Sequence, residues 1–162
     1  MDPLSKTWVY MSNRPFTDLE ASEILRSLNY FTKEWTAHGF NLKASGELRF
    51  NRFIVLMVDE TLAGASGCSI DKSVHFIKSV EQQYDVDFFN RLLFAWKKQD
   101  EIHVSPLGAL SDLYDNHQIS DETIVFNNNV ATKKQLEESW MVPLKKSWMF
   151  SRLRKRLIKI ER

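Results

Sequence analysis

The segment that most constrains the fold is Phe53 to Val58, FIVLMV, which runs directly into Asp59-Glu60. A strand that is apolar at every position must be covered on both faces of its sheet. A loop of small residues follows the acidic pair, and apolar residues then recur at helical spacing from Ile70 to Tyr84. We therefore predict a buried central strand, a short loop, and an amphipathic helix that packs on the sheet.

The remaining patterns of the first 97 residues extend this unit. Trp8 to Met11 is a short strand signal, and a capping-box sequence at Thr17 to Glu20 opens a helix. Leu42 to Phe50 alternates between apolar and polar residues, which indicates a strand with one wet face, and Leu92 to Trp96 is again apolar throughout. The order βαββαβ is that of ferredoxin-like domains. We predict an α+β fold with a ferredoxin-like core and an antiparallel sheet over residues 1–97.

The last third of the chain is predicted to complete the same single domain. Two helices cover only one face of such a sheet, so residues 98–145, with strand signals at 101–104 and 123–126, are expected to cover the other face. In residues 146–162, Phe150, Leu153, Leu157 and Ile160 form one stripe among basic residues. This pattern predicts a basic amphipathic C-terminal helix.

Composition excludes several classes of protein. The 22 Lys and Arg residues balance 21 Asp and Glu residues, which disfavours a nucleic-acid partner. No apolar run approaches the roughly 18 residues of a membrane span. The only cysteine rules out an internal disulfide and a CxxC-type metal site. The N-terminal segment lacks a signal-peptide pattern, so we expect a cytoplasmic protein without metal or cofactor, which is compatible with a homodimer.

Four stretches carry a resemblance to a known family: SNRPF at Ser12 to Phe16, EWTAHG at Glu34 to Gly39, RFIVLMVDE at Arg52 to Glu60, and SGCSIDKSVHFI at Ser66 to Ile77. Together they resemble a family of short bacterial proteins that often carry the label "ABC transporter ATPase". The likeness covers most of residues 8–96. It implies no catalytic residues.

The label itself conflicts with the motifs. Phe53 to Glu60 looks like a Walker B strand, but phosphates also need the glycine-rich loop GxxxxGK[ST]. The loop from Gly64 to Gly67 is instead followed by Cys68-Ser69, and an ABC signature segment is absent. We therefore do not expect ATP hydrolysis.

The start of the second helix offers a candidate thiol site. Cys68 lies where free amides and about half a positive charge would lower the pKa of a thiol and make it more nucleophilic. His38, in the loop after the first helix, is the candidate base, whereas His75 is two helical turns from the thiol. The alternative is a buried cysteine with a structural role.

The same entrance could bind an anion without any chemistry. Ser66, Gly67 and Ser69 would direct amides and hydroxyls at a ligand near Asp71, with Arg52 or Lys72 adding positive charge. The alternative is ordinary capping of the helix by Ser69 or Asp71.

Two other residue groups are interpreted as structural. Asp59 and Glu60 point to opposite faces of a strand, so we expect solvated acids and no metal site. The tryptophans are expected to lie in the core, with Trp140 and Trp148 partly exposed.

Three hypotheses follow for the function. The first is a non-catalytic module that binds a small anionic ligand or a protein partner at Ser66 to Asp71. The second is a thiol enzyme with Cys68 as nucleophile and His38 as base. The third is an interaction protein that acts through its basic tail.

Overall fold

The computed structural model describes residues 1–37, 39–61 and 64–153. The chain forms two compact units. Unit 1 comprises Met1–Phe89 and Asn128–Glu137, and unit 2 comprises Asn90–Asn127 and Glu138–Arg162. The mixture of helices and antiparallel sheets confirms the α+β class. The predicted boundary at residue 97 falls inside a strand of unit 2.

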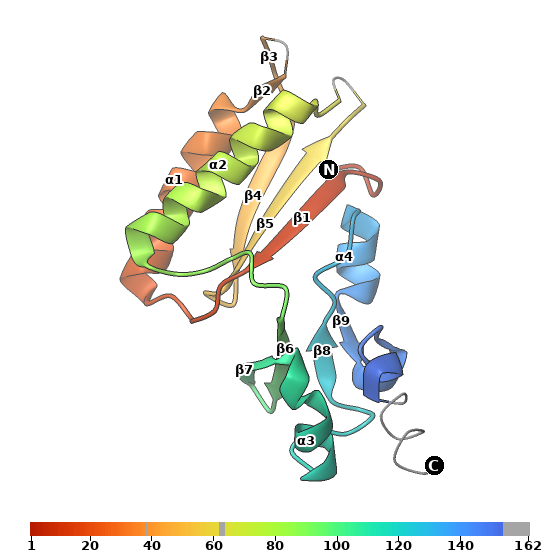
Figure 1. Cartoon of the computed structure of the whole chain (residues 1–162). Helices are drawn as coiled ribbons and strands as arrows, with labels where there is room; N and C mark the ends of the chain where they lie inside the picture. Colours follow the sequence, from red (N-terminus) through yellow and green to blue (C-terminus); the bar gives the residue numbers. More distant parts are fainter. Residues whose placement is uncertain (38, 62–63, 154–162) are drawn as a thin grey trace. The chain divides into compact units, whose positions relative to one another are not determined.

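Unit 1 is built on a three-stranded sheet in the order β1-β5-β4 (Figure 1). The central strand β5 (Phe53–Asp59) is antiparallel to both β1 (Lys6–Met11) and β4 (Lys43–Arg49). Every residue of β5 is buried. The prediction of a strand covered on both faces is therefore confirmed.

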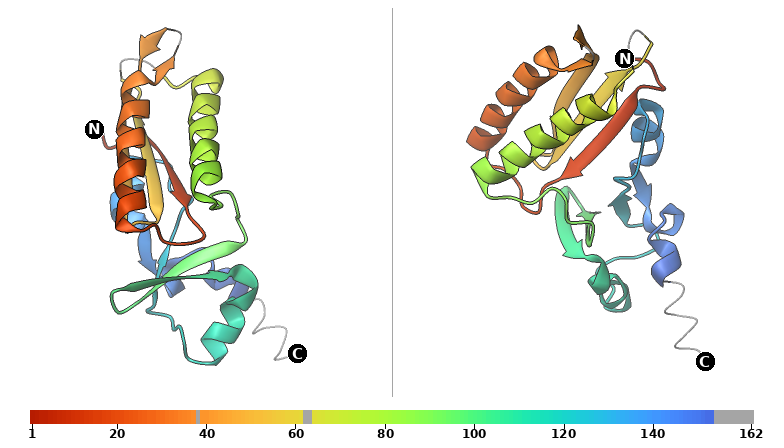
Figure 2. Two further views of the ribbon diagram at one scale, coloured as in Figure 1. Left: turned by 90° about the vertical axis from the view of Figure 1, so that its left-hand side faces the viewer. Right: turned by 45° about the horizontal axis from the view of Figure 1, so that its top comes forward.

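Two helices lie side by side on one face of this sheet, α1 (Asp18–Glu34) and α2 (Gly67–Tyr84) (Figures 1 and 2). The predicted capping box opens α1: the amide of Glu20 donates to Thr17 Oγ1 at 3.1 Å, and the Thr17 amide donates to Glu20 Oε1 at 3.0 Å. The buried cluster between helices and sheet consists of Phe16, Ile24, Leu28, Ile54, Leu56, Ile77, Val80, Val86 and Phe88.

The α1 helix approaches β4 most closely at a glycine. A Cβ atom added to Gly46 would lie 2.5 Å from Cγ of Leu28, whose side chain is fully buried. Real Cβ atoms do not tolerate such a distance, so the hydrogen at this position is what allows the helix to sit on the strand.

The buried stripe of α2 agrees with the predicted helical spacing at Ile77 and Val80 but not in the first two turns, where Ile70 and Val74 are only half-buried. Its first two turns bury Ser69 and Ser73, and Ile77 and Val80 follow. Both serine hydroxyls donate to backbone carbonyls three residues back, at 2.8 Å and 2.6 Å. Because the hydroxyls are satisfied within the helix, they can be buried at little cost.

The predicted fourth strand does not join this sheet. Residues Leu93–Lys98 form β6, which pairs with β7 (Glu101–Pro106) and β8 (Ile124–Phe126) in unit 2. With β9 (Met141–Pro143), these strands make a second sheet in the order β7-β6-β8-β9. The sheet of unit 1 therefore has three strands, and the prediction that Leu92 to Trp96 adds a fourth strand to it is wrong.

The outer edge of β1 is followed by a segment of the chain's last third. The amide of Thr7 donates to the Ala131 carbonyl at 3.0 Å, and the Lys133 amide donates to the Ser5 carbonyl at 3.0 Å. Lys6 and Thr132 form an isolated β-bridge between them. Helix α4 (Lys133–Ser139) begins directly after this bridge.

Unit 2 has its own apolar core. Its short helical elements are η1 (Leu107–Ala109), α3 (Leu110–Asp115) and η2 (Leu144–Lys146). The buried cluster consists of Phe94, Trp96, Leu107, Leu110, Ile119, Val125, Leu144, Met149 and Leu153.

Two predictions about the C-terminal region can be compared with the structure. Trp140 is buried, so its predicted partial exposure is wrong, whereas Trp148 is 39% exposed as expected. Residues 150–153 are helical, and the rest of the predicted basic helix, 154–162, lies outside the described residues. In the part of the chain that the structure describes, no helix is long and apolar enough to cross a membrane.

Candidate functional site

Helix α2 begins earlier than predicted, with a cap three residues before Ser69 and five residues before Asp71. Ser66 is the N-cap, with extended backbone angles of φ −86° and ψ 167°, and its Oγ accepts from the amide of Ser69 at 3.2 Å. The prediction that Ser69 or Asp71 caps the helix is therefore wrong. Ser66 and Ser69 are both of a residue type favoured at an N-cap, and Ser66 is the one that caps the helix.

Ser69 anchors the helix start to the protein interior. It is buried, its hydroxyl donates to the Ser66 carbonyl at 2.8 Å, and its own carbonyl accepts from Trp35 Nε1 at 2.8 Å. Trp35 is the C-cap residue of α1 and is also buried. The amide and the hydroxyl of Ser69 are already hydrogen-bonded. Ser69 therefore positions the helix start and does not offer a group to a ligand.

The exposed part of the entrance is formed by Gly67 and Cys68. The side chain of Ser66 accepts from the amide of Ser69, so the amides of Gly67 and Cys68 take no part in the side-chain cap. A Cβ atom added to Gly67 would meet nothing within 4 Å. An incoming group can therefore approach the backbone here.

Electrostatically, this helix start differs from that of α1. The first turn of α1 carries Asp18 and Glu20, whereas the first turn of α2 carries no acidic residue. The partial positive charge of the α2 start is thus not balanced by a carboxylate of its own first turn.

The next turn adds one charge of each sign. Asp71 and Lys72 are both exposed, and Lys72 Nζ donates to Thr36 Oγ1 at 3.3 Å. Thr36 belongs to β2 (Thr36–Ala37), which forms a small hairpin with β3 (Phe40–Asn41) after α1. The hairpin and the start of α2 lie at the same end of unit 1 (Figure 1).

The thiol of Cys68 is exposed. The alternative of a buried structural cysteine is therefore wrong. His38 lies outside the described residues, so its pairing with the thiol stays a prediction. His75 is exposed and lies seven residues further along α2, about 10 Å of helical rise from Cys68.

Arg52 does not belong to the helix entrance. It precedes β5, whereas α2 follows the loop at the other end of that strand, about 20 Å away along seven extended residues. The guanidinium is buried, Nη1 donates to the Ser12 carbonyl at 3.2 Å, and burial lowers its pKa. The prediction that Arg52 helps to bind an anion at Ser66 to Asp71 is wrong because the two positions lie at opposite ends of the sheet.

The acidic pair at the end of β5 makes hydrogen bonds to Thr61 and Ala65, on the way to α2. The Asp59 carboxylate is buried, accepts from the Thr61 amide at 3.0 Å and lies 3.4 Å from Lys43 Nζ. These contacts lower its pKa, with the Thr61 amide as the largest cause. Glu60 accepts from the Ala65 amide at 3.1 Å and pairs with Lys6 at 3.1 Å. The expectation of solvated acids is therefore wrong for Asp59.

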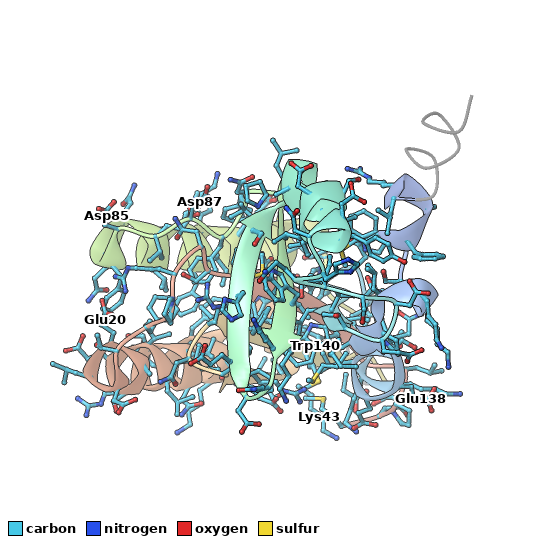
Figure 3. The ribbon with its side chains drawn as sticks, turned by 90° about the horizontal axis from the view of Figure 1, so that it is seen from below. Glu20, Lys43, Asp85, Asp87, Glu138 and Trp140 are labelled. Atoms are coloured by element: carbon cyan, nitrogen blue, oxygen red, sulfur yellow. The ribbon has the colours of Figure 1, made fainter. Side chains whose placement is uncertain are left out.

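A polar cluster that the sequence did not reveal lies at the other end of the helix pair. Arg14 donates to both carboxylate oxygens of Glu20 at 2.9 Å and to the Tyr84 carbonyl at 2.6 Å. The hydrogen bonds from Arg14 and from the Thr17 amide lower the pKa of Glu20 to about 2. Glu20 and Asp85, the C-cap residue of α2, are labelled in Figure 3. Arg14 thereby joins the start of α1 to the end of α2.

Comparison of the chain with protein-family models, curated proteins and solved structures finds no match. The resemblance to a bacterial family therefore stays a prediction.

Proposed function

We propose that the protein is a non-catalytic binding module that holds a small anionic ligand at the start of α2. The observation that carries this proposal is the exposed first turn of α2. Gly67 and Cys68 present amides outside the side-chain cap, and the turn has no carboxylate to balance its charge. Such a helix start attracts phosphate, sulfate or carboxylate groups.

The surrounding contacts support a preformed site. Trp35 and Ser66 hold the first turn in place through Ser69, and Glu60 fixes the preceding loop at Ala65. A ligand would therefore meet amides whose directions are already set, which reduces the entropy cost of binding. Lys72 adds one positive charge in the next turn, and Asp71 opposes it. We therefore expect a small ligand with one anionic group at the contact.

Substitution of Cys68 separates binding from folding. Cys68→Asp places a carboxylate in the first turn, where it competes with an anion yet stabilises the helix by about 0.3–1 kcal/mol. Cys68→Asn is the matched neutral control of nearly the same size. Calorimetric titration with inorganic phosphate and with sulfate should show saturable binding to the wild type and to Cys68→Asn. Cys68→Asp should bind at least about tenfold more weakly, a difference of about 1.4 kcal/mol, while unfolding at a higher temperature.

Two results would contradict this function. The first is a wild-type protein that takes up neither anion. The second is equal binding by the aspartate and asparagine variants, because a site at these amides cannot be indifferent to a charge placed among them.

The exposed thiol favours a second candidate, a thiol-dependent enzyme with Cys68 as nucleophile. A thiolate nucleophile reacts with iodoacetamide faster than an unactivated thiol does. At neutral pH the native protein should therefore be alkylated faster than free cysteine, and His38→Ala should slow the reaction. Alkylation no faster than that of free cysteine would eliminate this candidate.

We also propose that unit 1 is a ferredoxin-like unit that lacks its fourth strand. The strand order β1-β5-β4 and the position of both helices on one face support this relationship.

A further inference from the structure

The two edges of the unit 1 sheet differ. The outer edge of β1 is hydrogen-bonded to the backbone of Ala131 and Lys133. Beside β4, no strand of the described residues pairs with the outer edge. β4 is seven residues long, continuous in register with β5, and contains no proline. An edge of this kind is a template for pairing with another strand.

The charges along β4 are suited to pairing with a second copy of itself. In an antiparallel pair, directly opposite residues lie on the same face of the sheet. Two copies of β4 related by a two-fold axis must therefore pair about a central residue. Only three such registers join five or more residues of each strand. Pairing centred on Gly46 places Lys43 against Arg49, and pairing centred on Glu47 places two glutamates together. Pairing centred on Ser45 instead places Lys43 opposite Glu47 twice, and it is the only one of the three without opposed like charges.

The helix above β4 adds an apolar contact on the same side. Tyr84 of α2 donates to Glu23 of α1, so Glu23 marks the flank of α1 that faces α2. Leu25 lies two residues further, about 200° around the helix, and is 41% exposed. Leu25 therefore lies on the flank of α1 that is away from α2, above the open edge of the sheet. A two-fold axis at this edge would bring Leu25 of a second copy close to it.

We propose that two copies of this chain pair through β4, antiparallel and centred on Ser45, so that two three-stranded sheets join into one of six strands. The interface is self-complementary, with Lys43 of each copy opposite Glu47 of the other. The two α1 helices then lie on the same face, with Leu25 between them. This interaction surface is independent of the anion site at the start of α2.

Charge exchange across the strand tests the register directly. Sedimentation velocity over a concentration series should show the wild type reaching about twice the chain mass of 19.0 kDa. Glu47→Lys opposes Lys43 twice and should weaken dimerisation by about tenfold. Adding Lys43→Gln to that variant removes the opposed like charges without placing a carboxylate beside the buried Asp59, which lies 3.4 Å from Lys43 Nζ, and should restore most of the dimerisation. Glu34→Lys makes the same charge change on an exposed helix position and should leave the dimer unchanged.

Leu25→Asp provides a variant that does not touch the strand, and it should also yield monomers while keeping the thermal unfolding of the fold. A wild type that sediments as a monomer throughout the series overturns the proposal. So does a double variant that dimerises no better than Glu47→Lys, because only the register centred on Ser45 predicts the rescue.

Discussion

The contact between Gly46 of β4 and Leu28 of α1 yields a quantitative prediction for Gly46→Ala. The new methyl group would lie 2.5 Å from Leu28 Cγ and 2.8 Å from Cδ1. Leu28 is fully buried, so its side chain cannot turn into solvent. Overpacking of this kind costs about 1–3 kcal/mol, while replacing a glycine lowers the entropy of the unfolded chain and returns about 0.4–1 kcal/mol. We expect a net destabilisation of about 1–2 kcal/mol.

A double-mutant cycle isolates the clash. Leu28→Ala alone should cost about 2–5 kcal/mol because it leaves a cavity. In that background the methyl group of Gly46→Ala meets no side chain, so it should cost nothing or stabilise slightly. The two changes should therefore couple by about 1–3 kcal/mol in unfolding free energy measured by chemical denaturation. Gly108→Ala is the control, because its added Cβ meets nothing within 4 Å.

Additive effects of Gly46→Ala and Leu28→Ala would refute this reasoning. They would show that α1 does not rest on β4 at this glycine, and the position of the whole helix layer would then need revision.

Two further predictions concern the ends of the helices. The hydrogen-bonded Glu20 has a pKa of about 2 instead of the usual 4.5, so its ionised form stabilises the fold above pH 4.5. The stability advantage of the wild type over Glu20→Gln should shrink as the pH falls from 4.5 towards 2, and a pH-independent advantage would contradict this assignment. Trp35→Phe removes the donor to the buried Ser69 carbonyl and should lower the unfolding free energy by about 1–3 kcal/mol. The exposed Trp148→Phe should change it far less, and equal losses in urea denaturation would count against the anchoring role.

Local patterns predicted the elements of unit 1 well. The apolar run of β5 and the capping box at Thr17 are both confirmed, because each depends on neighbours in sequence. The strand predicted from the alternating pattern is found as β4, but its burial does not alternate, since Ala44 to Arg49 are all half-buried. Phe50 lies beyond the strand in a turn with φ 55° and is half exposed. An apolar side chain at the end of an alternating pattern carries no signal that distinguishes strand from turn.

Strand pairing was less predictable. The apolar pattern of Leu92 to Trp96 correctly indicates a strand, β6, yet its partners are β7 and β8 and not β1. Both sheets offer an environment for such a strand, and the choice depends on contacts with residues far along the chain. A hairpin with β7 needs only a two-residue connection, which is the shorter loop to close.

The candidate site was predictable in its position but not in all of its residues. Its position at the start of α2 follows from the small-residue loop and the helical spacing, and the exposure of Cys68 is consistent with that position. The buried stripe was misread because Ser69 and Ser73 satisfy their own hydroxyls, so polar residues occupy positions where an apolar pattern is expected. Arg52 was misassigned because closeness in sequence to the loop hid the length of β5 between them.

The central claim is that the amides at the start of α2 receive an anion, and amide chemical shifts test it most directly. Titration of isotopically labelled protein with inorganic phosphate should shift the amide resonances of Gly67 and Cys68 saturably, with a common dissociation constant. The amides of Asp18 and Leu19 at the start of α1, which has its own acidic first turn, should stay in place. Shifts that are absent at Gly67 and Cys68, or that are equally large at both helix starts, would contradict the claim.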